Sequence, residues 1–203
     1  MKLMRTAGAL ALAMTLGGCS LGGLLGGGGK GPTTLVTLTP EAPAPAAIAR
    51  SAAAGQAVTI QTPSTAKELE AVRVPVQVTP TDIQYVTNLQ LVDVPARLFR
   101  DLVAETVRRT TSRVVLNPDQ TSLDPGVTLT GVLQRFGYDA ASGQVVVEYD
   151  GVLSTAGGNR VEARRFVATA PSDGTAGSVG LALNRAANQV AADVAGWVGN
   201  SAG

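Results

Sequence analysis

The stretch VTLTGVLQRFGYDAASGQVVVEYDGVLSTAGGNRVEARRFVAT, residues 127–169, contains three runs rich in valine and threonine, separated by two turn-like segments. The runs predict strands over Val127–Tyr138, Gln144–Ser154 and Arg160–Thr169. Both connections are rich in Gly, Asp, Ser and Asn, which predicts an antiparallel meander. In the middle run, alternate positions form a mainly apolar face and an increasingly polar face, as expected for a sheet that is covered on one side.

The segments on either side of this meander each predict a helix. Before it, Pro95–Thr110 has an apolar stripe at i, i+3/i+4, i+7 spacing and a charged opposite face, on which Arg97 and Asp101 are spaced for an ion pair. After it, Ala176–Val198 repeats apolar residues with a helical period, and its Trp197 is either a core or edge cap or a membrane-interface anchor. These patterns predict an α+β fold, with a mostly antiparallel sheet and two main helices packed on one face.

Shorter strand-like runs precede the central helix or follow it directly. They are rich in β-branched residues and bounded by polar residues or proline: Thr34–Pro40, Val58–Ile60, Arg73–Val78, Asp82–Val86 and Arg113–Leu116. Pro75 places the third run at a sheet edge or predicts a bulge in it. We therefore expect one domain over residues 34–199, followed by a short tail over 200–203.

The N-terminus has the pattern of an exported lipoprotein. A positively charged start is followed by an apolar stretch, Ala7–Leu16, which is too short to span a bilayer as a helix. The next residues, Leu-Gly-Gly-Cys ending at Cys19, resemble the bacterial lipobox. This motif implies that residues 1–18 are a signal peptide and that Cys19 carries a diacylglycerol and an N-terminal fatty acyl chain such as palmitate. The alternative is an ordinary signal peptide with a stray or buried cysteine.

Residues 19–33 connect this anchor to the domain and consist mostly of glycine. Such a chain is flexible and has a root-mean-square span of about 5–6 Å × √n, so we expect a tether about 20 Å long. Ser20 follows the cysteine, where an aspartate would oppose sorting to the outer membrane in bacteria with two membranes. The predicted location is therefore the periplasmic face of the outer membrane.

The composition excludes several kinds of catalytic site. The chain contains no histidine, which removes Ser–His and Cys–His nucleophile pairs and histidine-based metal sites. Its only cysteine is assigned to lipid. Without Lys2 and Arg5, 14 basic residues face 15 acidic ones, and aromatic residues make up 3% of the chain, so a nucleic-acid surface is not predicted. We expect a protein that is not an enzyme and that uses no cofactor or metal.

Glu148 and Asp150 form a candidate carboxylate pair. They lie two positions apart on a predicted strand, so their side chains share a face about 6–7 Å apart. Paired carboxylates serve acid–base hydrolysis, but a solvated outer face has the same pattern. We expect the solvated face, with Arg164 of the next strand pairing with Glu148 or Asp150.

The run RVPVQVTPTDIQYVTNLQLVDVPARLFRDLVAETVRRTTSRVVL, residues 73–116, resembles the ABC-type transport auxiliary lipoproteins, the PqiC-like group. The shared order is a valine-rich strand, a tyrosine-bearing strand at Ile83–Val86, a helix at Ala96–Thr110 and a strand at Val114–Leu116. The downstream strands and the alanine-rich last helix follow in the same order, so the resemblance covers nearly all of the domain. Family members commonly have a tryptophan just before the central helix, where this chain has Leu-Val-Asp-Val at 91–94.

The resemblance implies a non-catalytic accessory of a lipid-transport system. Such a system combines an inner-membrane ABC transporter with an MCE-domain protein that crosses the periplasm, and the lipoprotein would dock onto it from the outer membrane. The implied partners are the MCE-domain protein and its transporter, besides the membrane that holds the acyl chains; assembly into a homo-oligomer stays open. The alternative is a structural or assembly lipoprotein of the outer membrane without a transport role.

The segment Gln84–Pro95 is the candidate contact with this partner. It joins a predicted strand to the central helix and carries four apolar side chains: Tyr85, Leu89, Leu91 and Val94. This is more apolar surface than a loop without a partner needs. The alternative is that these side chains pack under the helix.

Overall fold

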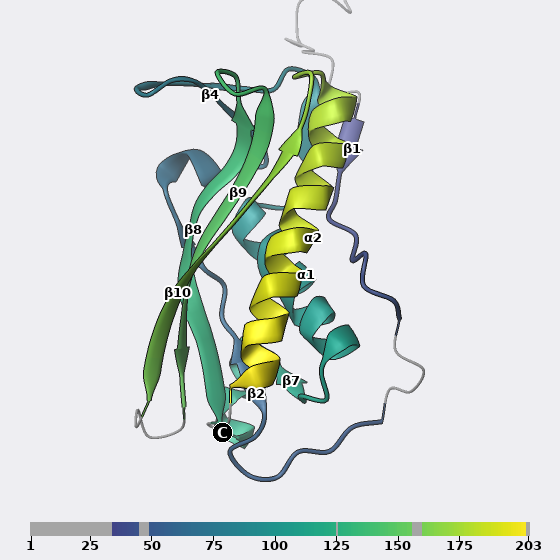
Figure 1. Ribbon diagram of the computed structural model, residues 1–203, viewed down its shortest axis with the longest axis vertical. Helices are drawn as coiled ribbons and strands as arrows, with labels where there is room; N and C mark the ends of the chain where they lie inside the picture. The colour runs from purple at the N-terminus through teal and green to yellow at the C-terminus, as the bar shows by residue number, and fades with distance from the viewer. Residues whose placement is uncertain (1–33, 45–48, 125, 156–159, 202–203) are drawn as a thin grey trace, which may run out of the picture. The chain divides into compact units, whose positions relative to one another are not determined.

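The computed structural model of the chain describes residues 34–44, 49–124, 126–155 and 160–201 (Figure 1). The expected signal peptide, the lipid-attachment residue Cys19 and the tether lie outside these residues. Within the described part of the chain, no helix has the length and hydropathy needed to cross a membrane.

Three long antiparallel strands form one side of the larger sheet, as residues 127–169 predict. They are β8 (Val127–Asp139), β9 (Gln144–Ser154) and β10 (Val161–Pro171). β9 lies between the other two, and its Tyr149 is directly opposite Phe166 of β10. Both side chains point into the core, so the apolar positions of neighbouring strands are in register.

The rest of this sheet is mixed, and the expectation of a mostly antiparallel sheet is wrong. Among the described residues, four of its seven strand pairings are parallel: β2–β7, β2–β8, β3–β8 and β4–β8. The short strands are β2 (Val58–Ile60), β3 (Ser64–Thr65), β4 (Pro75–Thr79), β5 (Asp82–Tyr85) and β7 (Val115–Leu116).

The parallel pairings have one topological cause. β2, β3 and β4 are successive pieces of one segment that runs along β8, pairing first with Val127, then with Val132 and then with Tyr138. A segment that runs beside a distant strand is free to be parallel to it, whereas a short hairpin must be antiparallel. β4 and β5 form such a hairpin, with a register shift between Gln77 and Thr79.

A second, two-stranded sheet pairs β1 (Thr34–Val36) with β6 (Leu89–Leu91) in parallel. In the part of the chain that the structure describes, the connections contain the 3-10 helices η2 (Lys67–Leu69) and η3 (Pro118–Leu123).

Two α-helices cover one face of the larger sheet, as predicted (Figure 1). They are α1 (Pro95–Thr110) and α2 (Ala176–Asn200). A row of aromatic rings runs from one helix to the other over the covered face of the sheet, with 5.1–6.5 Å between neighbouring centroids. Its members are Phe99 of α1, Tyr149 of β9, Phe166 of β10 and Trp197 of α2. The indole nitrogen of Trp197 donates to Glu162 at 3.1 Å, and the residue is buried. Trp197 is therefore an edge cap of the core.

Candidate functional site

The predicted contact segment, Gln84–Pro95, runs from the end of β5 through β6 to the start of α1. Leu89 and Leu91 alternate on β6 toward the core, and each is only 2% exposed. Leu89 packs close to Gly180 of α2. For Leu89 and Leu91 the structure therefore agrees with the alternative, packing inside the domain. Of the four predicted contact residues, Tyr85 and Val94 still have exposed surface.

Tyr85 is half-buried and held in a fixed position. The Arg73 guanidinium lies 3.9 Å from the centroid of its ring, a cation–π contact, and its hydroxyl donates to the Glu68 carbonyl oxygen at 3.5 Å. The ring therefore presents part of its surface beside the Arg73 cation, and contacts made before binding lower the entropy lost when a partner binds. Val94 is the residue before α1 and is also partly exposed.

Two exposed apolar residues beside these positions were missed by the sequence prediction. Ile83 is 39% exposed and lies two residues before Tyr85 on β5, so the two share a face. Val92 is 54% exposed. The signal was available for Val92, because strand alternation that buries Leu89 and Leu91 turns Gln90 and Val92 to the other side.

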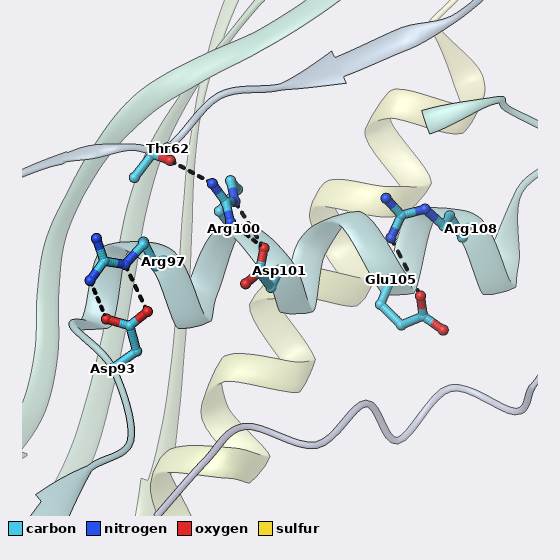
Figure 2. A network of polar contacts seen from close by, with 7 residues as sticks. All are labelled: Thr62, Asp93, Arg97, Arg100, Asp101, Glu105 and Arg108. Atoms are coloured by element: carbon cyan, nitrogen blue, oxygen red, sulfur yellow. Dashed lines mark hydrogen bonds and ion pairs between the residues drawn. The ribbon is translucent and has the colours of Figure 1, made fainter. Parts of the chain in front are cut away.

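Figure 2 shows the charged face of α1, where ion pairs form along the helix. Arg97 binds Asp93, which precedes the helix, through a bond of 2.7 Å from its Nε, so the expected pair of Arg97 with Asp101 is wrong. Asp101 instead accepts from Arg100, which also donates to Thr62 at 3.1 Å. The hydrogen bonds from Arg97 hold the pKa of the Asp93 carboxyl below its usual range.

Beside this charged face lies an open groove of about 390 Å³. One wall is α1, and the other is the extended segment that follows β1, through Thr37, Leu38 and Pro40. Buried or half-buried apolar side chains such as Ile60 and Leu102 line it, while charged side chains of α1 stand at its rim. The groove thus combines an apolar floor with a charged rim, a surface suited to an extended or amphipathic ligand.

The carboxylates of β9 belong to an ion-pair cluster on the uncovered face of the sheet. Arg165, not Arg164, pairs with them: its Nε lies 2.6 Å from Asp150 and its Nη1 lies 3.2 Å from Glu148. The expected role of Arg164 is wrong because the register places Arg165 opposite Asp150, while Arg164 turns to the ring of Trp197. Arg165 lowers the pKa of the Asp150 carboxyl, whereas a general acid requires a raised pKa.

Metal ligands do not gather in the described part of the chain. No three His, Cys, Asp or Glu side chains in that part come close enough to hold a metal ion. Among the described residues, the carboxylates of α1 and β9 form ion pairs with arginine.

The fold is shared with solved structures of low sequence identity. Protein XCC0632 from Xanthomonas campestris, of family DUF330, is 21% identical and aligns with a TM-score of 0.64 over 83% of this chain and 93% of that chain. A second, uncharacterized protein is 15% identical, with a TM-score of 0.60 over 74% of this chain and 96% of that one. At such identities the likeness concerns the fold alone. No curated protein matches the chain.

These neighbours define a class of α+β domains in which two helices cover a sheet with a long meander. A family model described as "ABC-type transport auxiliary lipoprotein component" matches residues 37–195. The chain belongs to this family. It is thus an auxiliary component of ABC-type transport, a role that implies transporter partners and a membrane-associated place in the periplasm.

Proposed function

We propose that this protein is an outer-membrane-anchored lipoprotein that serves an MCE-type ABC transport system for lipids without catalysing a reaction. The family match over residues 37–195 carries the proposal, because it covers the folded domain and names an auxiliary transport component. A lipobox that ends at Cys19 supplies the anchor, and Ser20 after it favours the outer membrane. Each methylene of the acyl chains adds about 0.8 kcal/mol of membrane affinity, so several chains on one residue anchor the protein stably.

The contact with the MCE-domain protein is proposed for the segment around Tyr85 and Val94. Figure 1 shows the β4–β5 hairpin extending from the rest of the domain. Ile83 and Tyr85 lie on one face of β5, and β5 pairs only with β4 among the described strands. An exposed edge with aromatic and aliphatic side chains fits a protein partner that adds an extended segment.

Co-purification from detergent-solubilised envelopes tests both parts of the proposal. The tagged protein is expected to recover an MCE-domain protein and its ABC transporter. Ile83→Glu is expected to reduce this recovery about tenfold or more, because it places a charge in an apolar contact. Leu123→Glu is the matched control: Leu123 is 73% exposed but lies on η3, outside the proposed contact, and its replacement should leave recovery unchanged.

The alternative, a structural or assembly lipoprotein, makes the opposite prediction. In that case the tagged protein recovers no MCE or ABC component, and deletion of the protein leaves the detergent sensitivity of the cells unchanged. Recovery that is equal for wild type, Ile83→Glu and Leu123→Glu would keep the transport role but refute the proposed contact.

A further inference from the structure

The segment that links β1 to the rest of the domain is bound along the two helices. After β1, residues 37–42 run beside α2 in Figure 1. We call residues 34–42 the arm. The amide side chains of α2 hold its backbone: Asn184 Oδ1 accepts from Thr39 N, and Asn188 Oδ1 accepts from Glu41 N, each at 2.8 Å.

Asn188 binds the arm as a neighbouring strand would. Besides accepting from Glu41 N, its Nδ2 donates to the Thr39 carbonyl oxygen at 2.9 Å. Asn188 is only 7% exposed, so water has little access to its side-chain amide, and the arm supplies hydrogen-bond partners in place of water. Farther along the arm, Nη1 of Arg109 in α1 donates to the Ala42 carbonyl oxygen at 2.8 Å. The Nε of the same arginine donates to the Glu105 carboxylate at 2.7 Å.

Apolar packing fixes the start of the arm. A Cβ atom added at Gly180 of α2 would lie 3.1 Å from Cγ2 of Val36, so the glycine allows the close approach of β1. Val92 N donates to the Val36 carbonyl oxygen at 3.0 Å. The docking thus uses a three-residue strand, a few side chains from the helices, and the packing of Val36 and Leu38 against the core. Opening one peripheral segment costs less free energy than unfolding the whole core.

We propose that the arm is a latch that limits how far the domain can move from its membrane. The inference rests on the attachment of Cys19 to lipid in the proposed function. With the arm docked, 15 residues, 19–33, separate the attachment point from the first docked residue. With the arm released, 31 residues, 19–49, precede Arg50, which binds the Thr111 carbonyl oxygen. The maximal reach of the chain then roughly doubles, because it is proportional to the number of residues.

Hydrogen exchange tests the docking directly in the acylated protein. The amides of Thr39 and Glu41 should be protected in the wild type. The double substitution Asn184→Ala with Asn188→Ala should raise their exchange rates about tenfold or more, since it removes hydrogen bonds from both amides. Gln189→Ala is the matched control, because it removes an exposed amide of the same helix that contacts Asp193 instead of the arm.

A second pair of variants keeps the test independent of the asparagines. Gly180→Ala should also raise exchange in the arm by crowding Val36, whereas Gly177→Ala should not, because a Cβ at Gly177 meets nothing within 4 Å. Far-UV circular dichroism checks that each variant is folded. Equal exchange in wild type and both releasing variants would refute the docked arm.

Neutron reflectometry on supported bilayers tests the reach. The separation between bilayer and domain should increase when the asparagines are replaced, because the chain between them is longer. A disulfide between Val36→Cys and Gly180→Cys should hold the separation at the short value until it is reduced. An unchanged separation in a variant whose arm exchanges freely would refute the latch alone. Absence of an acyl mass on Cys19 would refute the anchor, and with it the latch, while the exchange data would still report whether the arm docks.

Discussion

Tyr149 carries a polar hydroxyl into the apolar layer between the sheet and the helices. The residue is 2% exposed, and its hydroxyl donates to the Thr130 carbonyl oxygen at 2.7 Å. This bond satisfies the hydroxyl where water is excluded. Burial also raises the pKa of Tyr149 above the ordinary value, because the ionised phenolate would lose its hydration.

Tyr149→Phe should lower the free energy of unfolding by about 1 kcal/mol at pH 7, measured by urea denaturation, because it leaves the Thr130 carbonyl oxygen without this partner. The raised pKa in the folded state means that the wild type loses stability as pH rises above about 10. Phenylalanine does not titrate, so the difference between the two proteins should narrow there. A difference that stays constant from pH 7 to pH 11 would contradict this.

Cys19 is the residue on which membrane attachment depends. Cys19→Ser should abolish lipid labelling and leave the precursor uncleaved or the domain mislocalised, because a hydroxyl does not accept the diacylglycerol at a lipobox. Mass spectrometry of the mature protein is the measurement. A mature N-terminus other than Cys19, without an acyl mass, would refute lipid attachment.

At the level of elements, α2 packs on β9 where β9 has no side chain. A Cβ atom added at Gly151 would lie 2.9 Å from the ring of Tyr149 and 3.1 Å from the ring of Trp197. The lack of a side chain at Gly151 therefore allows α2 and β9 to pack closely. Gly196, on the exposed side of α2, has no atom within 4 Å of such a Cβ.

These two glycines predict opposite effects of the same substitution. Gly151→Ala should lower the free energy of unfolding by about 1–3 kcal/mol, because two rigid rings must move. Gly196→Ala should raise it by about 0.5–1 kcal/mol, since alanine favours the helix and meets no obstacle. Urea denaturation of both variants measures the difference, and similar shifts in the two proteins would contradict this account of the interface.

At the scale of the whole molecule, all but one of the ion pairs among the described residues join an arginine to a carboxylate, the exception being Lys67 with Glu70. Hydrogen bonds from arginine are the largest cause of a lowered carboxyl pKa at four sites: Asp93, Glu105, Asp139 and Asp150. A lowered pKa adds stability that is present above the unfolded-state value and is lost as pH falls through the folded-state value. No histidine titrates in the neutral range, because the chain contains none.

The free energy of unfolding should therefore be nearly constant between about pH 6 and pH 8 and should fall below about pH 4. Urea denaturation across this range is the measurement. Asp150→Asn should make the free energy of unfolding fall less steeply at acidic pH, because it removes one carboxyl whose pKa is lowered. A stability that changes steeply near pH 6.5 would contradict this prediction.

The sequence alone determined the elements whose hydrophobic period is long and regular. Alternation over residues 127–169 predicted β8, β9 and β10, and helical spacing predicted α1 and α2, because each pattern repeats often enough to identify one buried face. The candidate anchor, Cys19, and the lack of histidine were likewise visible in the sequence. The family resemblance over residues 73–116 agrees with the family match.

Only the tertiary structure decided the pairing of the short segments. Strands of two to five residues contain no information on direction, so the parallel course of β2, β3 and β4 along β8 had to come from long-range contacts. Likewise, only the tertiary structure decided that Arg165, and not Arg164, pairs with the carboxylates of β9, because a one-residue change of register turns every side chain to the other face. Leu89 and Leu91 looked like contact residues for a similar reason: their partners in the core, β1 and α2, are remote in the sequence.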